Sequence, residues 1–150
     1  SSAPPQPDAT YYLVRHAEKL KGDDPALTPD GSARAIALRE RLASVDLTAI
    51  YSSDYKRTQE TAAPTAAAQN LSVISYDPRD LPGIAEILKT QTGAILVVGH
   101  SNTTPPLAEL MGAEPGEPIV EATEYDRLYV ITRTGDTIEG HIEQYGAKSP

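Results

Sequence analysis

Two histidines of this chain stand directly after hydrophobic runs. Arg15 and His16 follow the apolar residues 11–14, and Gly99 and His100 follow the apolar run 94–98. In a parallel α/β sheet, the side chains just beyond the carboxyl ends of the strands converge on one crevice. The sequence therefore predicts two imidazole rings in one pocket.

A third strand end adds polar groups of the same kind. The short run 49–51 is followed by a segment, 52–58, that contains two serines and Arg57. A guanidinium group is a planar fork that matches phosphate oxygens, and an imidazole can act as a nucleophile or as a charged donor. The three strand ends together indicate a phosphate site.

The elements that must position these groups alternate between strand and helix. Strands are predicted over 10–14, 49–51, 71–75 and 94–98, and helices over 32–42, 55–69, 81–90 and 105–111. Pro64 is expected to kink or break the second helix. Residues 127–132 and 137–144 predict a terminal β-hairpin. The fold class is therefore α/β: a three-layer sandwich with a mainly parallel central sheet, helices on both faces and an antiparallel edge.

Composition excludes several classes of function. A net charge of −8 argues against a nucleic-acid or anionic-membrane surface, because both need a basic footprint. The chain has no cysteine, which excludes disulfides and thiolate catalysis. No run approaches the roughly 18–20 apolar residues that span a bilayer. We expect no transmembrane segment and no nucleic-acid partner.

The start of the chain is rich in proline. We expect residues 1–9 to form a flexible tether and residues 10–146 to form a single catalytic domain. A tether of this kind is typical of an exported protein whose signal has been removed, and a trimmed chain has the same appearance. Exported and cytoplasmic locations therefore stay equally open.

Three ordered blocks resemble the histidine phosphatase superfamily, the phosphoglycerate mutase-like branch 1. They are residues 13–18 (Leu-Val-Arg-His-Ala-Glu), 51–62 (Tyr-Ser-Ser-Asp-Tyr-Lys-Arg-Thr-Gln-Glu-Thr-Ala) and 97–102 (Val-Val-Gly-His-Ser-Asn). The resemblance implies that His16 is a nucleophile that takes the phosphoryl group on a ring nitrogen. It implies that Arg15, Arg57 and His100 hold the phosphate oxygens, with Ser52 as an additional donor.

The chain departs from the pattern of this family in two places. Ala17 stands where a glycine usually follows the histidine, which requires a negative φ there. The carboxyl group that protonates the leaving oxygen has no clean match. Asp80 is the first candidate by position, and Glu18, two residues beyond the nucleophile, is the second. Asp80 also suits the N-cap of the predicted helix 81–90, and Glu18 also suits a solvated loop.

The resemblance implies a phosphatase that hydrolyses a phosphomonoester or a phosphoramidate through a phosphohistidine on His16. The substrate would be a small phosphorylated compound or a phosphorylated protein side chain. A short chain has little room to cover its pocket, so we expect an open site, which favours hydrolysis. A mutase-type phosphotransferase and a catalytically silent phospho-ligand binding module stay open as alternatives. Dispersed histidines predict no metal site, no cofactor is implied, and His141 is interpreted as structural.

Overall fold

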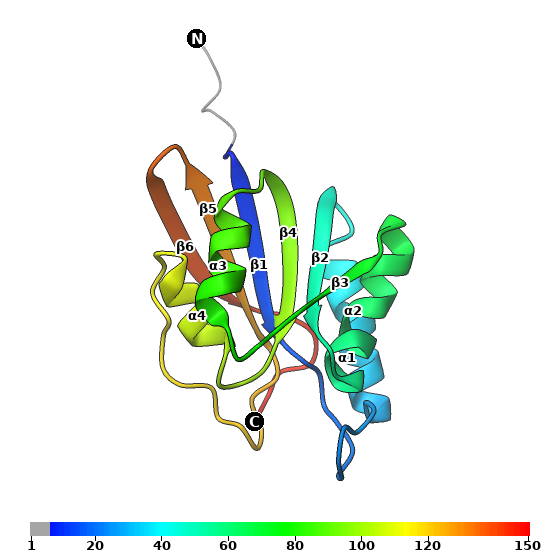
Figure 1. Ribbon diagram of the computed structural model, residues 1–150. Helices are drawn as coiled ribbons and strands as arrows, with labels where there is room; N and C mark the ends of the chain where they lie inside the picture. The colour runs from blue at the N-terminus through cyan, green and yellow to red at the C-terminus, as the bar shows by residue number, and fades with distance from the viewer. Residues whose placement is uncertain (1–6) are drawn as a thin grey trace.

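A six-stranded sheet forms the centre of the molecule in the computed structural model, which describes residues 7–150. Its spatial order is β3-β2-β4-β1-β5-β6 (Figure 1). The strands are β1 (Ala9–Arg15), β2 (Leu47–Ser53), β3 (Val73–Tyr76), β4 (Gly93–Gly99), β5 (Arg127–Thr134) and β6 (Thr137–Gln144). The first four pair in parallel, whereas β5 and β6 are antiparallel to their neighbours. The predicted mixed α/β sheet with an antiparallel edge is confirmed.

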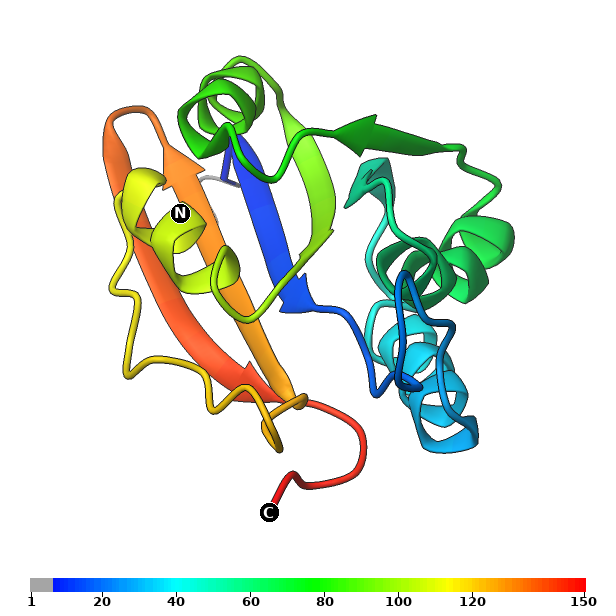
Figure 2. The same ribbon diagram turned by 60° about the horizontal axis from the view of Figure 1, so that its bottom comes forward.

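Helices cover both faces of this sheet, as predicted. They are α1 (Pro29–Arg41), α2 (Lys56–Gln69), α3 (Leu81–Lys89) and α4 (Thr104–Leu110). Alternate residues of the central strands point to opposite faces, so Tyr12 and Leu96 share one core with Leu38 of α1. Ile95, from the other set, shares the second core with Leu88 of α3. Figure 2 shows the molecule with the edge at which the parallel strands end turned forward.

The folded part extends beyond the predicted domain limits at both ends. Residues 1–6 of the predicted tether lie outside the described residues. Asp8 already extends the pairing of β1 with both neighbouring strands, because its N–H donates to the Arg133 carbonyl over 2.7 Å and its carbonyl accepts from Gly93 over 3.0 Å. At the other end, Ser149 N–H donates to the Asp126 carboxylate over 3.0 Å. Local sequence pattern did not reveal these contacts.

Pro64 does not break α2. The helix runs continuously from Lys56 to Gln69 with the proline inside it. Proline removes one backbone hydrogen bond, but Ala62 and Ala66 on the same helix are buried against the core. Tertiary packing therefore holds the helix through the residue where the sequence predicted an interruption.

Two glycines allow backbone segments to approach the site closely. A Cβ atom at Gly31, in the first turn of α1, would lie 2.1 Å from the Glu18 carbonyl oxygen. A Cβ at Gly99 would lie 2.8 Å from the Tyr76 hydroxyl and 2.9 Å from Thr103 Oγ1. Only glycine leaves room at these two positions, which fix the loops that follow β1 and β4.

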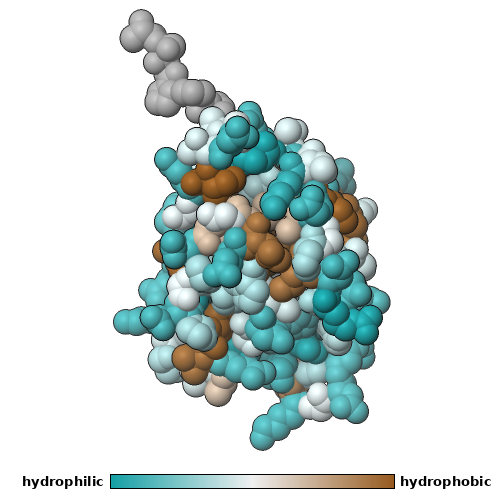
Figure 3. Space-filling view, turned by 60° about the vertical axis from the view of Figure 1, so that its left-hand side comes forward, coloured by the Kyte–Doolittle hydropathy of each residue, from teal (hydrophilic) through white to brown (hydrophobic). Residues whose placement is uncertain are grey.

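The outer surface is mixed in polarity. Figure 3 shows apolar side chains in small groups, separated by hydrophilic ones, on the face that it presents. The edge strand β6 carries mostly exposed residues, among them Glu139 and His141. Charged side chains on an edge strand discourage pairing with a second chain. Within residues 7–150, no helix is both long and apolar enough to cross a bilayer.

Candidate active site

The structure brings the three predicted strand ends together. His16 follows β1, His100 follows β4, and Arg57 stands in the first turn of α2, just after β2. The backbone N–H of His16 donates to the Gly99 carbonyl over 2.8 Å, which continues the β1–β4 pairing one step beyond the strands. The two imidazole rings meet edge to face, with their centroids 5.6 Å apart.

A backbone contact fixes the tautomer of His16. His16 Nδ1 lies 2.8 Å from the Ala17 carbonyl oxygen, and a carbonyl can only accept a hydrogen bond. Nδ1 therefore carries the proton, and Nε2 has a free lone pair. The Ala17 N–H donates to Thr61 Oγ1 over 2.9 Å, which holds this turn on α2. Ala17 does not have a positive φ, so an alanine is tolerated where the family usually has a glycine.

His16 is more deeply enclosed than an open site would allow. Its exposed fraction is 3%. Burial, together with the nearby charges of Arg15, His100 and Arg57, lowers the pKa of His16 to about 3. The ring is therefore neutral near pH 7, as a nitrogen nucleophile must be.

His100 is oriented by a buried hydroxyl network. Its Nε2 lies 2.8 Å from Ser53 Oγ, and Ser53 Oγ lies 2.9 Å from Thr58 Oγ1. Burial and the charges of Arg57 and Arg15 lower the pKa of His100 to about 4. The sequence assigned the hydroxyl of this strand end to Ser52. Ser52 is fully buried and donates to the Ser53 carbonyl, so the hydroxyl beside the imidazole belongs to Ser53.

Two arginines lie beside the histidines, and each has an N–H donor without a hydrogen-bond partner among the described residues. The Nε atoms of Arg15 and Arg57 are buried and have no hydrogen-bond partner among residues 7–150. The Arg57 guanidinium stacks on Tyr55, with its Cζ 4.6 Å from the ring centroid. A buried N–H without a hydrogen-bond partner destabilises the folded state. Both guanidinium groups are therefore suited to bind an anion that accepts this hydrogen bond.

A segment distant in sequence covers this site and explains the enclosure of His16. Arg15 Nη1 and Nη2 donate to the carbonyls of Glu124 and Glu121, each over 2.7 Å. The Tyr125 ring lies over the Arg15 guanidinium at 4.0 Å and has its centroid 6.1 Å from that of His16. Sequence reasoning missed Tyr125, because no local pattern connects it with a residue more than 100 positions away.

The two candidate acids occupy different environments. Glu18 makes a two-bond ion pair with the buried Arg34, at 2.8 Å from Nε and 2.9 Å from Nη2. Burial raises the pKa of Glu18, but the hydrogen bonds and charge of Arg34 outweigh burial and hold it below its usual value. Asp80 is exposed, and its Oδ1 accepts from Gly83 N–H as the N-cap of α3. His141 lies on β6 and contacts Glu143, away from the site.

The Arg34–Glu18 pair is expected to be a major support of the loop after His16. Arg34 also donates to the carbonyls of Tyr145 and Ala147. Arg34→Met should lower the free energy of unfolding by about 2–4 kcal/mol, because it leaves a carboxylate and two carbonyls without their donor. Urea unfolding measures this loss, and Arg39→Met, on the exposed side of the same helix, should change stability by less than about 0.5 kcal/mol.

The same pair gives a pH dependence of known sign. Because the folded-state pKa of Glu18 is depressed, its contribution is fully present above the unfolded pKa and is lost as pH falls through the folded pKa. The stability difference between the wild type and Glu18→Gln should therefore shrink on acidification below about pH 4.5. A difference that grows toward acid would contradict this account of the pair.

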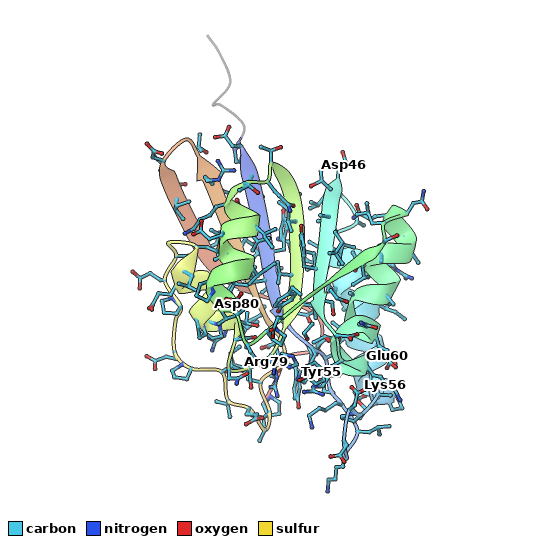
Figure 4. The ribbon with its side chains drawn as sticks, in the orientation of Figure 1. Asp46, Tyr55, Lys56, Glu60, Arg79 and Asp80 are labelled. Atoms are coloured by element: carbon cyan, nitrogen blue, oxygen red, sulfur yellow. The ribbon has the colours of Figure 1, made fainter. Side chains whose placement is uncertain are left out.

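A pocket of about 220 Å³ opens beside His100. Its lining contains two arginines and no carboxylate, and consists of Tyr55, Arg57, Pro78, Arg79, His100, Asn102 and Thr103. Figure 4 shows Tyr55 and Arg79 close together at the edge where the parallel strands end, with Asp80 at the start of α3. In the described part of the chain, no group of three His, Cys, Asp or Glu residues has a metal-binding arrangement.

Comparisons with known proteins agree with this geometry. The model of the histidine phosphatase superfamily (branch 1) matches residues 11–79. An uncharacterized protein of Mycobacterium tuberculosis is 40% identical over 74 residues, which are 44% of this chain and 37% of the relative. Phosphoserine phosphatase 1 of Hydrogenobacter thermophilus is 42% identical over 73 residues, which are 43% of this chain and 35% of the relative. The matches thus span little more than a third of either relative.

Solved structures match over nearly the whole chain. A mycobacterial glucosyl-3-phosphoglycerate phosphatase has a TM-score of 0.69 at 14% identity, over 93% of this chain and 99% of that one. YhfR of Bacillus stearothermophilus has a TM-score of 0.69 at 19% identity, over 93% and 98%. The protein histidine phosphatase SixA, in complex with tungstate, has a TM-score of 0.63 at 17% identity, over 92% and 96%. The family model covers a little less than half of this chain, and the solved structures share its fold. Residues 11–79 are therefore similar to the histidine phosphatase superfamily, branch 1.

Proposed function

We propose that this protein is a phosphatase that hydrolyses a phosphomonoester or a phosphoramidate through a phosphohistidine on His16. The observation that carries the proposal is the state of His16. Its Nδ1 is committed to the Ala17 carbonyl, so the neutral ring offers Nε2, next to arginine donors that lack partners. A neutral nucleophile beside free cationic donors is the arrangement that phosphoryl transfer requires.

The reaction would proceed in two displacements. His16 Nε2 attacks phosphorus, the P–O or P–N bond to the leaving group breaks, and the leaving group takes up a proton. Water then attacks the phosphohistidine, which breaks the P–Nε2 bond and releases inorganic phosphate. Arg15, Arg57 and His100 would stabilise the negative charge on the three other phosphoryl oxygens. The two guanidinium groups can supply positive charge, and the His100 ring, neutral near pH 7 in the free protein, can supply an N–H donor, which supports a mechanism without a metal.

Small phosphorylated compounds fit the pocket better than bulky ones. Its volume of about 220 Å³ is below the roughly 300–1,000 Å³ of sites that hold drug-sized ligands. The similar structures include a phosphatase of a sugar phosphoglycerate and a protein histidine phosphatase, so both P–O and P–N substrates are reasonable classes to test. The pocket beside His100 is open to solvent although His16 itself is buried, and water that enters this pocket favours hydrolysis over transfer to a second substrate.

The first test is turnover of an aryl phosphate by the purified protein. We expect release of inorganic phosphate without added metal, and a phosphoprotein in quenched reactions that is labile to acid and stable to base. Release of phosphate without a trapped phosphoprotein would contradict the covalent route. Tight vanadate binding without any turnover would instead identify a silent phospho-ligand binding module.

We propose Asp80 as the general acid, because Glu18 is held ionised by Arg34 while Asp80 is exposed next to the pocket residues Pro78 and Arg79. Asp80→Asn should slow hydrolysis of alkyl phosphates by about 10²-fold, because an alkoxide leaves poorly, and should slow aryl phosphates much less. Asparagine retains an N-cap oxygen, so α3 should remain capped.

Comparison of kcat for the two substrate classes measures this split. Glu18→Gln is the matched control and should slow both classes by a similar factor. If Glu18→Gln slows alkyl phosphates more than aryl phosphates and Asp80→Asn does not, Glu18 is the general acid. If the wild type cleaves both classes and neither variant slows alkyl phosphates more than aryl phosphates, neither carboxylate is the general acid.

A further inference from the structure

A chain of hydrogen bonds leads inward from His100. Its Nε2 lies 2.8 Å from Ser53 Oγ, which lies 2.9 Å from Thr58 Oγ1. Thr58 Oγ1 in turn lies 2.8 Å from the Ser53 carbonyl and 3.0 Å from the Tyr55 carbonyl. Each hydroxyl has a single proton to donate, so the direction of donation along this chain decides which nitrogen of His100 carries a proton.

The carbonyls at the inner end set this direction. A carbonyl oxygen only accepts, so Thr58 donates its proton to a carbonyl and accepts from Ser53. Ser53 Oγ then has no proton left for the ring and accepts from His100 Nε2–H. This direction makes three hydrogen bonds, whereas the reverse direction makes two. The direction with more bonds is the more stable one in a buried network, so the neutral His100 ring carries its proton on Nε2.

The other ring nitrogen of His100, Nδ1, is left with a lone pair. It has no hydrogen-bond partner among residues 7–150 and is not buried, and His100 lines the pocket. The charged groups that line this pocket with His100 are Arg57 of α2 and Arg79 of the segment between β3 and α3, and Arg15 at the end of β1 acts on the same ring. These positive charges stabilise a lone pair at Nδ1 and disfavour an N–H there.

His16 has the opposite tautomer. Its Nδ1 donates to the Ala17 carbonyl, so its lone pair is on Nε2. The centroids of the two rings are 5.6 Å apart, and a phosphoryl dianion bound by both rings would therefore meet two lone pairs, which repel its oxygens. One ring must gain a proton. That ring is His100, because a protonated His16 has no lone pair with which to attack phosphorus.

The charges around the two rings agree with this assignment. Burial and the charges of Arg57 and Arg15 lower the pKa of His100 to about 4, and the pKa of His16 is lower still, about 3. A dianion in the pocket opposes these causes, because an opposite charge in contact favours the protonated ring. His100 is the ring that is more easily protonated.

From this chain of donors we infer that Ser53 and Thr58 are positioning residues that hold the proton of His100 on Nε2, so that binding of a phosphoryl dianion takes up one proton from solvent at Nδ1. The imidazolium then donates from Nδ1 to a phosphoryl oxygen, and the proton returns to solvent when inorganic phosphate leaves. The inference deepens the proposed phosphatase function and rests on it for its place in the reaction. Its test uses binding of an inert oxyanion, so that the two can fail separately.

Tungstate is the probe, because it has the shape and charge of a phosphoryl dianion and carries no proton of its own at neutral pH. Titration calorimetry in buffers with different enthalpies of ionisation counts the protons taken up. The wild type should take up about one proton per bound tungstate, and its affinity should fall about tenfold for each pH unit above neutrality. Nitrogen NMR of the histidine rings should show His100 protonated at Nε2 alone in the free protein and at both nitrogens with tungstate.

Thr58→Val removes the acceptor of the Ser53 proton at nearly constant volume. Ser53 can then donate to Nε2 of His100, whose own proton moves to Nδ1, and the uptake on tungstate binding should fall below about half a proton. Thr58→Ser restores the hydroxyl and should restore the uptake. Thr65→Val is the matched control, because it removes another buried threonine hydroxyl of α2, one without a partner among the described residues, and should keep the wild-type uptake.

Four results would each overturn the inference: no proton uptake by the wild type, wild-type uptake in Thr58→Val, an equal loss in Thr65→Val, or a proton that NMR places on His16. An N–H at Nδ1 of His100 in the free protein would also overturn it. If tungstate binds with the expected uptake while aryl phosphates are not turned over, the phosphatase proposal fails and the proton linkage stands. Turnover without proton uptake would give the reverse outcome.

Discussion

Replacement of His16 by alanine is expected to abolish turnover and phosphoprotein formation together. Its Nε2 is the free ring nitrogen in the two-histidine site, because Nδ1 donates to the Ala17 carbonyl. Loss of a covalent nucleophile typically costs several orders of magnitude, and we expect a loss of at least about 10⁴-fold in kcat. Steady-state assays with an aryl phosphate and acid-free trapping of the labelled protein measure the two effects.

A histidine elsewhere in the chain controls for the loss of an imidazole. His141→Ala removes an exposed ring whose contact is with Glu143 on the same strand, and it should leave turnover unchanged. Circular dichroism should show that both variants retain the fold. A His16→Ala protein that keeps more than a few per cent of the wild-type rate would rule out the covalent mechanism.

Most of the fold was predictable because local pattern and tertiary structure agree. Each central strand is an apolar run buried on both faces, such as 94–98, and the charged or polar residues that follow mark its end. The convergence of His16, Arg57 and His100 follows from the same rule, since parallel strands end at one edge of a sheet. The family match supports this assignment but adds no geometry to it.

The remaining features depend on contacts that no local pattern contains. Ser52 and Ser53 are identical in type, and only the contacts at the end of β2 decide which hydroxyl meets His100. Arg15 is bound by carbonyls more than 100 residues away, and Arg34 binds Glu18 and the end of the chain. These long-range contacts also enclose His16, so the open site expected from the short chain is not found at the nucleophile.

The second large effect is expected from the groups that hold the phosphoryl oxygens. Arg57→Ala and His100→Ala should each lower kcat by about 10²–10³-fold, because each removes positive charge or a donor from the transferring group. Arg57→Lys should recover only part of this loss, since an ammonium keeps the charge but not the planar fork. Lys56→Ala, next in the chain but exposed, should lose no more than about twofold.

Binding of vanadate separates a role at the phosphoryl group from a merely structural one. The buried Nε of Arg57 has no partner in the described structure, so a bound vanadate can accept a hydrogen bond from it. The affinity of Arg57→Ala for vanadate should therefore fall in parallel with kcat. For His100, Ser53→Ala provides a second probe, because it removes the hydroxyl at 2.8 Å that orients the ring but leaves the ring in place. We expect Ser53→Ala to lose less activity than His100→Ala. Vanadate affinities that stay at the wild-type value in Arg57→Ala and His100→Ala would place these two side chains outside the phosphoryl site, and the clamp would then have to be built from other residues.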